Sequence, residues 1–539
     1  YHRGITSHAA AEKFLNPDWE ADTHDAFLMK DMEKAVDRIL RAIEKNERII
    51  IYSDYDTDGI PGAVVVHDFF TKIGFSNFRT YIPHRIDEGF GLNEEAVREL
   101  SEDGGKLLIT IDCGIADVKE VKLANSLCLD VIITDHHVPG EVLPPAYAIV
   151  NPKQAEDRYP YQMLCGCGVA FKLIQGILAR NNFGLKPGLE KWFLDMVGIA
   201  TLSDMVPLKG ENRVLAYYGL KVLQKSPRLG LARLLRKLRV RQSSLSEDDI
   251  GFSLSPRINA ASRMGIPMEA FKLLTTTDET VADMLADYLN DINEERKGMV
   301  AAMVKEMRRT VEERLLHEKA LIVLGNPKWK PSLLGLAANT LREAYGKSTF
   351  LWGREGGDEI KGSCRSDGTV NLVTLMQKVS PGVLKASGGH AFSGGFSVSA
   401  ERIHELEEAL LAAHRLLSPE ESKVERAYID GILSLEEVNW EIYRMIEKLA
   451  PFGEENPKPH FLFSKISIKA LKKFGKQNNH LELTFETESG ARVKAIKFFS
   501  DPKFFELQAG SEVDLIAMLE NGTFGRYPEL RLRIVDIEA

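Results

Sequence analysis

Residues 48–59 read Arg48-Ile49-Ile50-Ile51-Tyr52-Ser53-Asp54-Tyr55-Asp56-Thr57-Asp58-Gly59, and this stretch decides the fold. Its first half is a continuous apolar run, typical of a strand that is buried on both faces. Similar runs at 107–111, 131–134 and 148–150 predict further strands, and helix-like segments near 62–73, 93–101 and 116–127 separate them. This alternation predicts an α/β fold, in which a parallel sheet carries helices on both faces.

Acidic loops follow three of the predicted strands. Asp54, Asp56 and Asp58 follow the first strand, Asp112 follows the second, and Asp135-His136-His137 follows the third. Because ligands bind at the carboxyl ends of the strands in open parallel sheets, we expect these loops to meet at one edge. Clustered carboxylates repel one another unless cations neutralise them. A set of carboxylates and imidazoles suits Mn²⁺, with Mg²⁺ as the alternative, so we expect two ions about 4 Å apart.

Simpler interpretations exist for each of these residues taken singly. A lone Asp after a strand usually caps a helix or closes a turn, and a lone His is usually structural. Three such loops in consecutive strand–helix units favour the metal site. Cys165-Gly166-Cys167 lacks a second Cys/His pair, so we expect small buried residues there rather than zinc ligands.

The sequence changes in character twice after the first predicted unit. Apolar residues at helical spacing over residues 279–316 predict a long connecting helix. A smaller α/β unit follows, with a strand at 320–324, helices at 332–345 and 401–416, and a glycine-rich stretch at 388–395. Short alternating segments then predict strands at 460–471, 480–487, 492–499, 511–519 and 529–537. They fit a small barrel of the OB type, a common binder of single strands, and a small sandwich is the alternative.

Composition sets broad limits on the 539-residue chain. It is 44% hydrophobic and 27% charged, which is ordinary for a soluble globular protein. No apolar run approaches the roughly 20 residues of a membrane helix, and the first residues show no signal-peptide pattern. Five cysteines make no disulfide framework, so we expect a cytoplasmic location. The net charge of −9 is only a weak argument against a nucleic-acid partner. A protein that binds nucleic acid needs a local concentration of positive charge rather than a positive net charge.

Four motifs resemble, in order and spacing, those of the DHH phosphoesterase family: residues 54–59, Asp112-Cys113-Gly114, Asp135-His136-His137 and residues 203–208. The resemblance implies two bound divalent ions. The ligands that it implies are Asp56, Asp58, Asp112, His136 and Asp204, with Asp54 as a supporting residue or an occasional ligand. It also places His137 by the scissile phosphate, where we expect it to stabilise charge or donate a proton. Asp204 is assigned by this resemblance alone, since by itself it looks like a helix-end residue.

Within that family the chain resembles the RecJ exonucleases over nearly its whole length. The segments that carry this resemblance are 82–92, 151–154, 166–172, 256–263, 388–390 and 450–457. By this resemblance Arg85, Ser363 and Arg365 hold a 5′-terminal phosphate, and His390 faces the metal site from the second lobe as a catalytic residue beside His137 and Asp112. Further expected substrate-binding residues lie in Gly/Ser/Asn-rich loops: Arg257, Arg263, Gly388 and Gly389. A surface or interlobe salt bridge is the simpler interpretation of each arginine.

The resemblance divides the chain into five parts. They are an N-terminal extension (1–45), a DHH catalytic domain (46–278), a connecting helix (279–316), a DHH-associated domain (317–420) and an OB-like nucleic-acid-binding domain (425–539). Departures from the family pattern fall at Ser262 and Ser332, where glycine is usual, and leave the metal ligands untouched.

Two further sets of residues keep alternative interpretations. The basic run Arg228, Arg233, Arg236, Lys237, Arg239 and Arg241 either lines a path for a nucleic-acid backbone or forms a solvated helix face. The aromatic residues Phe461, Phe463, Phe474, Phe485 and Tyr527 either stack on bases or, as is commoner, form the barrel core.

The resemblance implies a metal-dependent 5′→3′ exonuclease that releases mononucleotides from single-stranded DNA in repair and recombination. A single-strand-binding protein and a RecQ-type helicase are its expected partners. The alternatives are a DHH phosphodiesterase of short oligonucleotides or cyclic dinucleotides, and a non-catalytic replication scaffold of the same fold.

Overall fold

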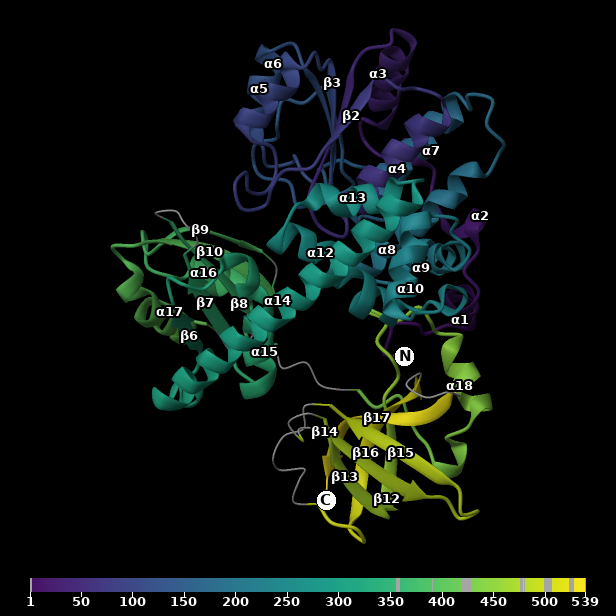
Figure 1. Ribbon diagram of the computed structural model, residues 1–539, viewed down its shortest axis with the longest axis vertical. Helices are drawn as coiled ribbons and strands as arrows, with labels where there is room; N and C mark the ends of the chain where they lie inside the picture. The colour runs from purple at the N-terminus through teal and green to yellow at the C-terminus, as the bar shows by residue number, and fades with distance from the viewer. Residues whose placement is uncertain are drawn as a thin grey trace.

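The computed structural model describes residues 2–354, 359–389, 391–417, 428–475, 478, 480–498, 507–522 and 528–538. Three sheets organise this part of the chain, one near each end of the molecule and one at its side (Figure 1).

The first sheet is the predicted parallel one. Its five strands run in the order β2-β1-β3-β4-β5, and every neighbouring pair is parallel. The strands are β1 (Ile49–Ser53), β2 (Phe78–Tyr81), β3 (Leu107–Ile111), β4 (Asp130–Thr134) and β5 (Ala148–Val150). The sequence prediction missed β2 at the edge, because Phe78-Arg79-Thr80-Tyr81 is only half-buried and has no apolar run.

Helices cover both faces of this sheet, which confirms the predicted fold class. Ile49 and Ile51 of β1 pack in one core with α3 (Met32–Glu44), α4 (Gly59–Lys72) and α7 (Gly166–Arg180). Ile50 and Tyr52 point to the other face and pack with α5 (Glu94–Glu102) and α6 (Val118–Ser126). Because successive side chains of a strand alternate between faces, each β1 residue is buried by one layer or the other.

A helical subdomain continues the first lobe. It contains α8 (Leu194–Ser203), α9 (Gly210–Leu223), α10 (Leu229–Leu238), the π-helical turn η4 (Ile250–Leu254), α12 (Ser255–Met264) and α13 (Pro267–Thr275). From it α14 (Glu279–Glu313) extends across the molecule to the second lobe (Figure 1). This helix ends three residues earlier than predicted.

The second lobe contains a mixed sheet in the order β6-β7-β8-β10-β9. Its strands are β6 (Ile322–Gly325), β7 (Thr349–Gly353), β8 (Glu359–Arg365), β9 (Leu384–Gly389) and β10 (Ser393–Ser399), packed with α15 (Pro331–Tyr345), α16 (Leu372–Gln377) and α17 (Leu406–Arg415). The glycine-rich stretch therefore contributes to two antiparallel strands, with Gly395 paired to both Ser363 and Gly388.

The C-terminal strands form one continuous sheet in the order β11-β12-β16-β17-β15-β14-β13, as a barrel requires and a two-sheet sandwich does not. They are β11 (Gly431–Ile432), β12 (Phe461–Ser467), β13 (Ala470–Phe474), β14 (His480–Glu486), β15 (Arg492–Lys497), β16 (Glu512–Gly522) and β17 (Glu529–Glu538). The helix α18 (Trp440–Glu447) and the chain after it connect this barrel to the first lobe.

Candidate metal centre

The acidic loops follow β1, β3 and β4 and meet at the carboxyl edge of the first sheet. The β1 loop turns sharply into α4, and Gly59 makes the turn possible, since a Cβ there would lie 2.4 Å from the carbonyl oxygen of Asp54. At the end of β3, Asp112 has a left-handed backbone with φ of 60°. The neighbouring α7 approaches so closely that a Cβ on Gly166 would lie 2.5 Å from the Cβ of Asp112. Both glycines are thus required by close packing around the carboxylates.

Asp58 directly precedes α4 in the chain, and its carboxylate lies at the N-terminus of α7. Its carboxylate accepts hydrogen bonds from the backbone N–H groups of Gly166, at 2.6 Å, and Cys167, at 2.8 Å, and the residue is only 1% exposed. The free N–H groups and the dipole of a helix N-terminus stabilise an anion at this position. The sequence predicted small buried residues at Cys165-Gly166-Cys167 and a family resemblance over 166–172, but it did not predict this backbone contact.

Asp135 orients the two histidines. Its Oδ1 accepts hydrogen bonds from the backbone N–H of His136 at 2.7 Å, the backbone N–H of His137 at 3.0 Å and the Nδ1 of His137 at 2.8 Å. Its Oδ2 accepts one from Ile115 at 3.0 Å. Burial favours protonation of this carboxyl, but the hydrogen bonds from His137 and the backbone lower the pKa of Asp135 overall. The sequence analysis quoted Asp135 in its motif without giving it this orienting role.

Three sets of potential ligand atoms overlap in this edge. Within each set the atoms lie within 4.8 Å of one another: Asp54, Asp56 and Asp112; Asp58, His136 and Asp204; and Asp112, His136 and His137. The Nε2 of His136 is central, at 3.2 Å from Asp112, 3.6 Å from Asp204 and 3.7 Å from Asp58. The structure therefore brings together all six residues predicted as metal ligands.

The electrostatics of the cluster fit a cation. Burial, followed by repulsion among the carboxylates, raises the pKa values of Asp54, Asp112 and Asp204, and raises that of Asp58 to about 6. Burial lowers the pKa of His136 to about 3, which keeps its ring neutral and able to ligate. Asp54 Oδ1 and Asp112 Oδ1 are among the buried side-chain atoms of the described residues that have no hydrogen-bond partner. Buried oxygens without donors, beside a neutral imidazole, match the ligands of Mn²⁺, and Mg²⁺ fits the carboxylates.

An arginine cluster lies between the two lobes. Burial, together with the positive charges of Arg85, Arg296 and Arg365, lowers the pKa of Arg263 to about 9, so each of these three guanidinium groups is close enough to repel that of Arg263. Arg85 lies in the loop after β2, Arg296 in α14, Arg365 at the end of β8 and Arg263 in α12. Concentrated positive charge at low solvent exposure is suited to a phosphate group. Arg296 was missed in the sequence, because it lies among many charged residues of a long helix.

Other predicted substrate residues divide into two groups. The hydroxyl of Ser363 accepts a hydrogen bond from Arg365 Nη1 at 3.3 Å. Ser363 and Gly388 lie on the two strands that flank β10, each paired with Gly395. Arg257 instead donates to the carbonyl of Ser253 at 3.0 Å and lies 3.5 Å from Glu294, which matches the simpler salt-bridge interpretation. Gly389 ends β9, and His390 lies outside the described residues.

Acidic partners occupy most of the basic run. Arg228 contacts Asp68 and Asp195, and three residues of α10 contact acids of α14: Arg233 with Glu279, Arg236 with Asp283, and Lys237 with Asp287. These pairs support a helix–helix interface rather than a path for a nucleic-acid backbone.

The barrel aromatics also divide. Phe463 and Phe485 are fully buried in the barrel core, whereas Phe461 and Phe474 are half-buried. Tyr527 lies outside the described residues. The core interpretation therefore holds for Phe463 and Phe485.

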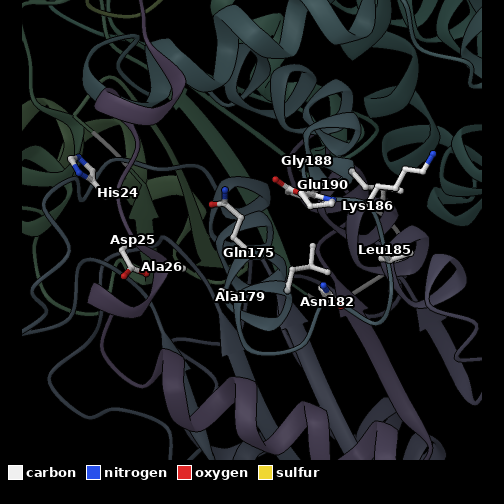
Figure 2. A pocket seen from close by; sticks show the side chains of 14 residues that line it. His24, Asp25, Ala26, Gln175, Ala179, Asn182, Leu185, Lys186, Gly188 and Glu190 are labelled. Atoms are coloured by element: carbon white, nitrogen blue, oxygen red, sulfur yellow. The ribbon is translucent and has the colours of Figure 1, made fainter.

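A separate pocket of about 470 Å³ lies on the far part of α7 (Figure 2). Gln175 and Asn182 line it from one side and His24 and Asp25 from another. Of the residues that line it in the described structure, none is a predicted site residue, so this pocket is distinct from the metal centre. In the described part of the chain, no helix has the length and apolarity needed to cross a membrane.

Comparisons with known proteins agree with this architecture. The DHH family N-terminal domain matches residues 48–201, the DHHA1 domain matches 317–416, and the RecJ OB domain matches 429–536. The single-stranded-DNA-specific exonuclease RecJ of Bacillus subtilis is 34% identical over 99% of this chain, which spans 66% of that protein's length. The exonuclease of the same name from Escherichia coli is 30% identical over 80% of this chain and 78% of its own length.

Solved structures show the same likeness. RecJ of Thermus thermophilus in complex with Mn²⁺ matches with a TM-score of 0.82 and 26% identity, over all of this chain and 74% of that one. An exonuclease RecJ bound to manganese matches with a TM-score of 0.62 and 30% identity, over 72% of this chain and 96% of that one. By sequence, domain content and fold, this chain belongs to the RecJ family.

Proposed function

We propose that this chain is a metal-dependent exonuclease that hydrolyses single-stranded DNA from its 5′ end and releases mononucleotides. One observation carries the proposal: six potential ligand residues, from four separate segments of the chain, converge at the carboxyl edge of the first sheet. The names of the relatives, which specify single-stranded DNA, support the substrate, and the relatives' Mn²⁺ and Mg²⁺ complexes support the metals.

In this proposal the ligands are Asp56, Asp58, Asp112, His136 and Asp204, with Asp54 in support. When bound, two divalent ions supply Lewis acidity and an activated water for attack on phosphorus. The backbone N–H groups at the start of α7 hold the Asp58 carboxylate in place, and the close approach of Gly166 confines Asp112.

His137 is the proposed charge-stabilising group. Burial opposes the charged form of its ring, but the Asp135 hydrogen bond and the nearby carboxylates raise the pKa of His137 above its usual value. Because Nδ1 is engaged by Asp135, Nε2 is the nitrogen left to face the phosphate and to donate a proton to the leaving oxygen. The same role for His390 stays a prediction.

The arginine cluster is the proposed basis of polarity. Arg85, Ser363 and Arg365, with Arg263 beside them, would bind the terminal 5′-phosphate and so place the first phosphodiester at the metals. The pKa of Arg263, lowered by burial and by the neighbouring guanidinium groups, supports an anion there, because a bound phosphate would offset the repulsion that these groups exert on Arg263.

The setting of this activity is also proposed from the family. We infer a cytoplasmic enzyme of DNA repair and recombination, whose barrel holds the single strand. A single-strand-binding protein and a RecQ-type helicase are its predicted partners.

A nuclease assay with Mn²⁺ on 5′-labelled and 3′-labelled strands, beside duplex controls, tests the proposal. The expected result is early release of mononucleotide from the 5′ end of single strands only, abolished by Asp112→Ala. Asp103→Ala is the matched control, because Asp103 pairs with Arg48 before β1, at the opposite edge of the same sheet. Turnover confined to dinucleotides would favour the small-substrate phosphodiesterase. Strand binding without turnover would favour the scaffold.

A further inference from the structure

The chain that leads into the barrel lies directly against the loop that carries Asp204. The backbone N–H of Leu208 donates to the carbonyl of Glu454 at 2.9 Å, and Lys209 Nζ lies 2.7 Å from Glu455 Oε2. Leu208 is 1% exposed, and a Cβ on Gly453 would lie 2.7 Å from its Cδ1. Residues 453–455, a turn of the barrel linker, thus pack against Leu208, which lies four residues after the predicted metal ligand Asp204.

This linker turn is itself firmly held. Gly453 and Asn456 exchange two backbone hydrogen bonds, at 3.0 and 3.1 Å. The fully buried Asn456 side chain donates to the carbonyls of Leu449, at 2.9 Å, and Pro451, at 2.8 Å. Arg213 of α9 donates to the carbonyls of Leu449, at 2.9 Å, and Ala450, at 3.2 Å. These hydrogen bonds hold the chain around the turn against α9 of the first lobe.

The loop after α8 takes a sharp path that depends on outside support. Asp204 is the C-cap residue directly after α8, and Met205 next to it has φ of 58°, a left-handed conformation that is unfavourable for a bulky side chain. Further along, the carbonyl of Pro207 accepts hydrogen bonds from the Tyr161 hydroxyl and the Asn212 side chain, both at 3.1 Å. Such a conformation persists only where the surroundings over-determine it.

We propose that the linker turn 453–455 is a positioning element for Asp204, so that docking of the barrel sets the affinity of one of the two metal positions. The inference rests on the proposed role of Asp204 as a ligand. Asp204 shares a set of ligand atoms with Asp58 and His136, whereas the set of Asp54, Asp56 and Asp112 does not include it. Displacement of the turn should therefore lower the affinity for one ion and leave the affinity for the other unchanged.

The test is Mn²⁺ titration of the full chain by calorimetry, with electron paramagnetic resonance to report the pair of ions. Gly453→Val places a branched side chain against Leu208, and we expect it to weaken one Mn²⁺ about 10-fold while the other stays within about 2-fold. Leu208→Ala in the Gly453→Val background removes the obstructing methyl groups and should restore part of the lost affinity. Thermal unfolding without metal confirms that each variant is folded.

Lys458→Met is the matched control. Lys458 also joins the barrel linker to the first lobe, but through Asp248 rather than through the Asp204 loop. The inference predicts unchanged affinity of both ions in this variant. It is overturned if Gly453→Val leaves both ions unchanged, if it weakens both equally, or if Lys458→Met has the same effect. A wild-type chain that binds no pair of Mn²⁺ ions would instead overturn the proposed function.

Discussion

Arg263 and Ser332 hydrogen-bond one another in both directions across the junction of the two lobes. The Arg263 Nη1 donates to the carbonyl of Ser332 at 2.8 Å, and the Ser332 hydroxyl donates to the carbonyl of Arg263 at 3.1 Å. The first residue belongs to α12 and to the arginine cluster, and the second lies near the start of α15. The second of these bonds depends on the hydroxyl of Ser332, one of the two positions where we expect a departure from the family pattern.

Replacement Ser332→Gly should loosen this junction without removing it. The backbone carbonyl still accepts from Arg263, but the lost hydroxyl bond is worth about 1 kcal/mol. We expect KM for 5′-phosphorylated strands to rise a few-fold while kcat stays within about twofold, because a less constrained Arg263 binds phosphate less well in ground and transition states alike. Steady-state kinetics on 5′-phosphate and 5′-hydroxyl strands check this. Equal changes on both substrates would contradict a link to the arginine cluster.

Asp135→Asn tests the orientation of His137. Asparagine keeps an oxygen that accepts from the backbone N–H groups of His136 and His137, but it loses the charge that favours the imidazolium form of His137. It also replaces the oxygen that accepts from Ile115 by an NH₂ group. We expect kcat to fall about 10- to 100-fold, the range typical of groups that orient metal-site residues. Mn²⁺ binding should change less than kcat does, and calorimetry beside single-turnover kinetics separates the two. If lost metal affinity accounts for the whole fall in kcat, Asp135 acts by positioning the metal ligand His136 rather than by orienting His137.

Strand ends explain why much of the centre was predictable. The apolar runs of β1, β3 and β4 identified a two-sided parallel sheet, and the shared edge of parallel strands brought Asp54–Asp58, Asp112 and His136 together in prediction as in structure. Asp204 follows a helix rather than a strand, so no periodicity in the sequence points to it. Only the family resemblance did.

Long-range contacts account for most of what the sequence did not reveal. The N–H groups of Gly166 and Cys167 reach Asp58 across more than a hundred residues, and backbone donors leave no mark in side-chain patterns. Arg296 lies among the many charged residues of a long helix, and its nearness to Arg263 depends on the fold. Strands β7, β8, β9, β10 and β11 were not predicted, because their short and glycine-containing segments lack clear alternation.

Asp117 should make stability depend on pH. Its carboxylate accepts from the N–H of Leu92 at 2.7 Å, and burial raises the pKa of Asp117 to about 6. An acid with a raised folded-state pKa stabilises the fold most below its unfolded pKa, and this contribution is lost as pH rises from about 4 to 6. Asp117→Asn keeps an acceptor for Leu92 and cannot ionise. At pH 7.5 we expect the free energy of unfolding of the variant to exceed that of the wild type by about 2 to 3 kcal/mol, and we expect this difference to vanish near pH 4, as measured by urea unfolding with chelator. A difference that does not vary with pH would rule out ionisation as the cause.

Asp112→Asn should reverse the order of stability when metal is added. Without metal, burial and the neighbouring carboxylates Asp58, Asp56 and Asp54 disfavour a charge at Asp112, so a neutral amide should raise the free energy of unfolding by about 1 kcal/mol. With Mn²⁺ at about 100 times its Kd, the wild type gains about 2.7 kcal/mol for each ion that binds only the folded state. The variant should gain much less, because it has lost a carboxylate that belongs to two of the three ligand sets. Tm measured with and without Mn²⁺ should therefore show the variant higher in chelator and the wild type higher in metal. Equal shifts in both proteins would mean that Mn²⁺ binds elsewhere on the chain, and Asp103→Ala, which should behave as the wild type does, controls for surface binding.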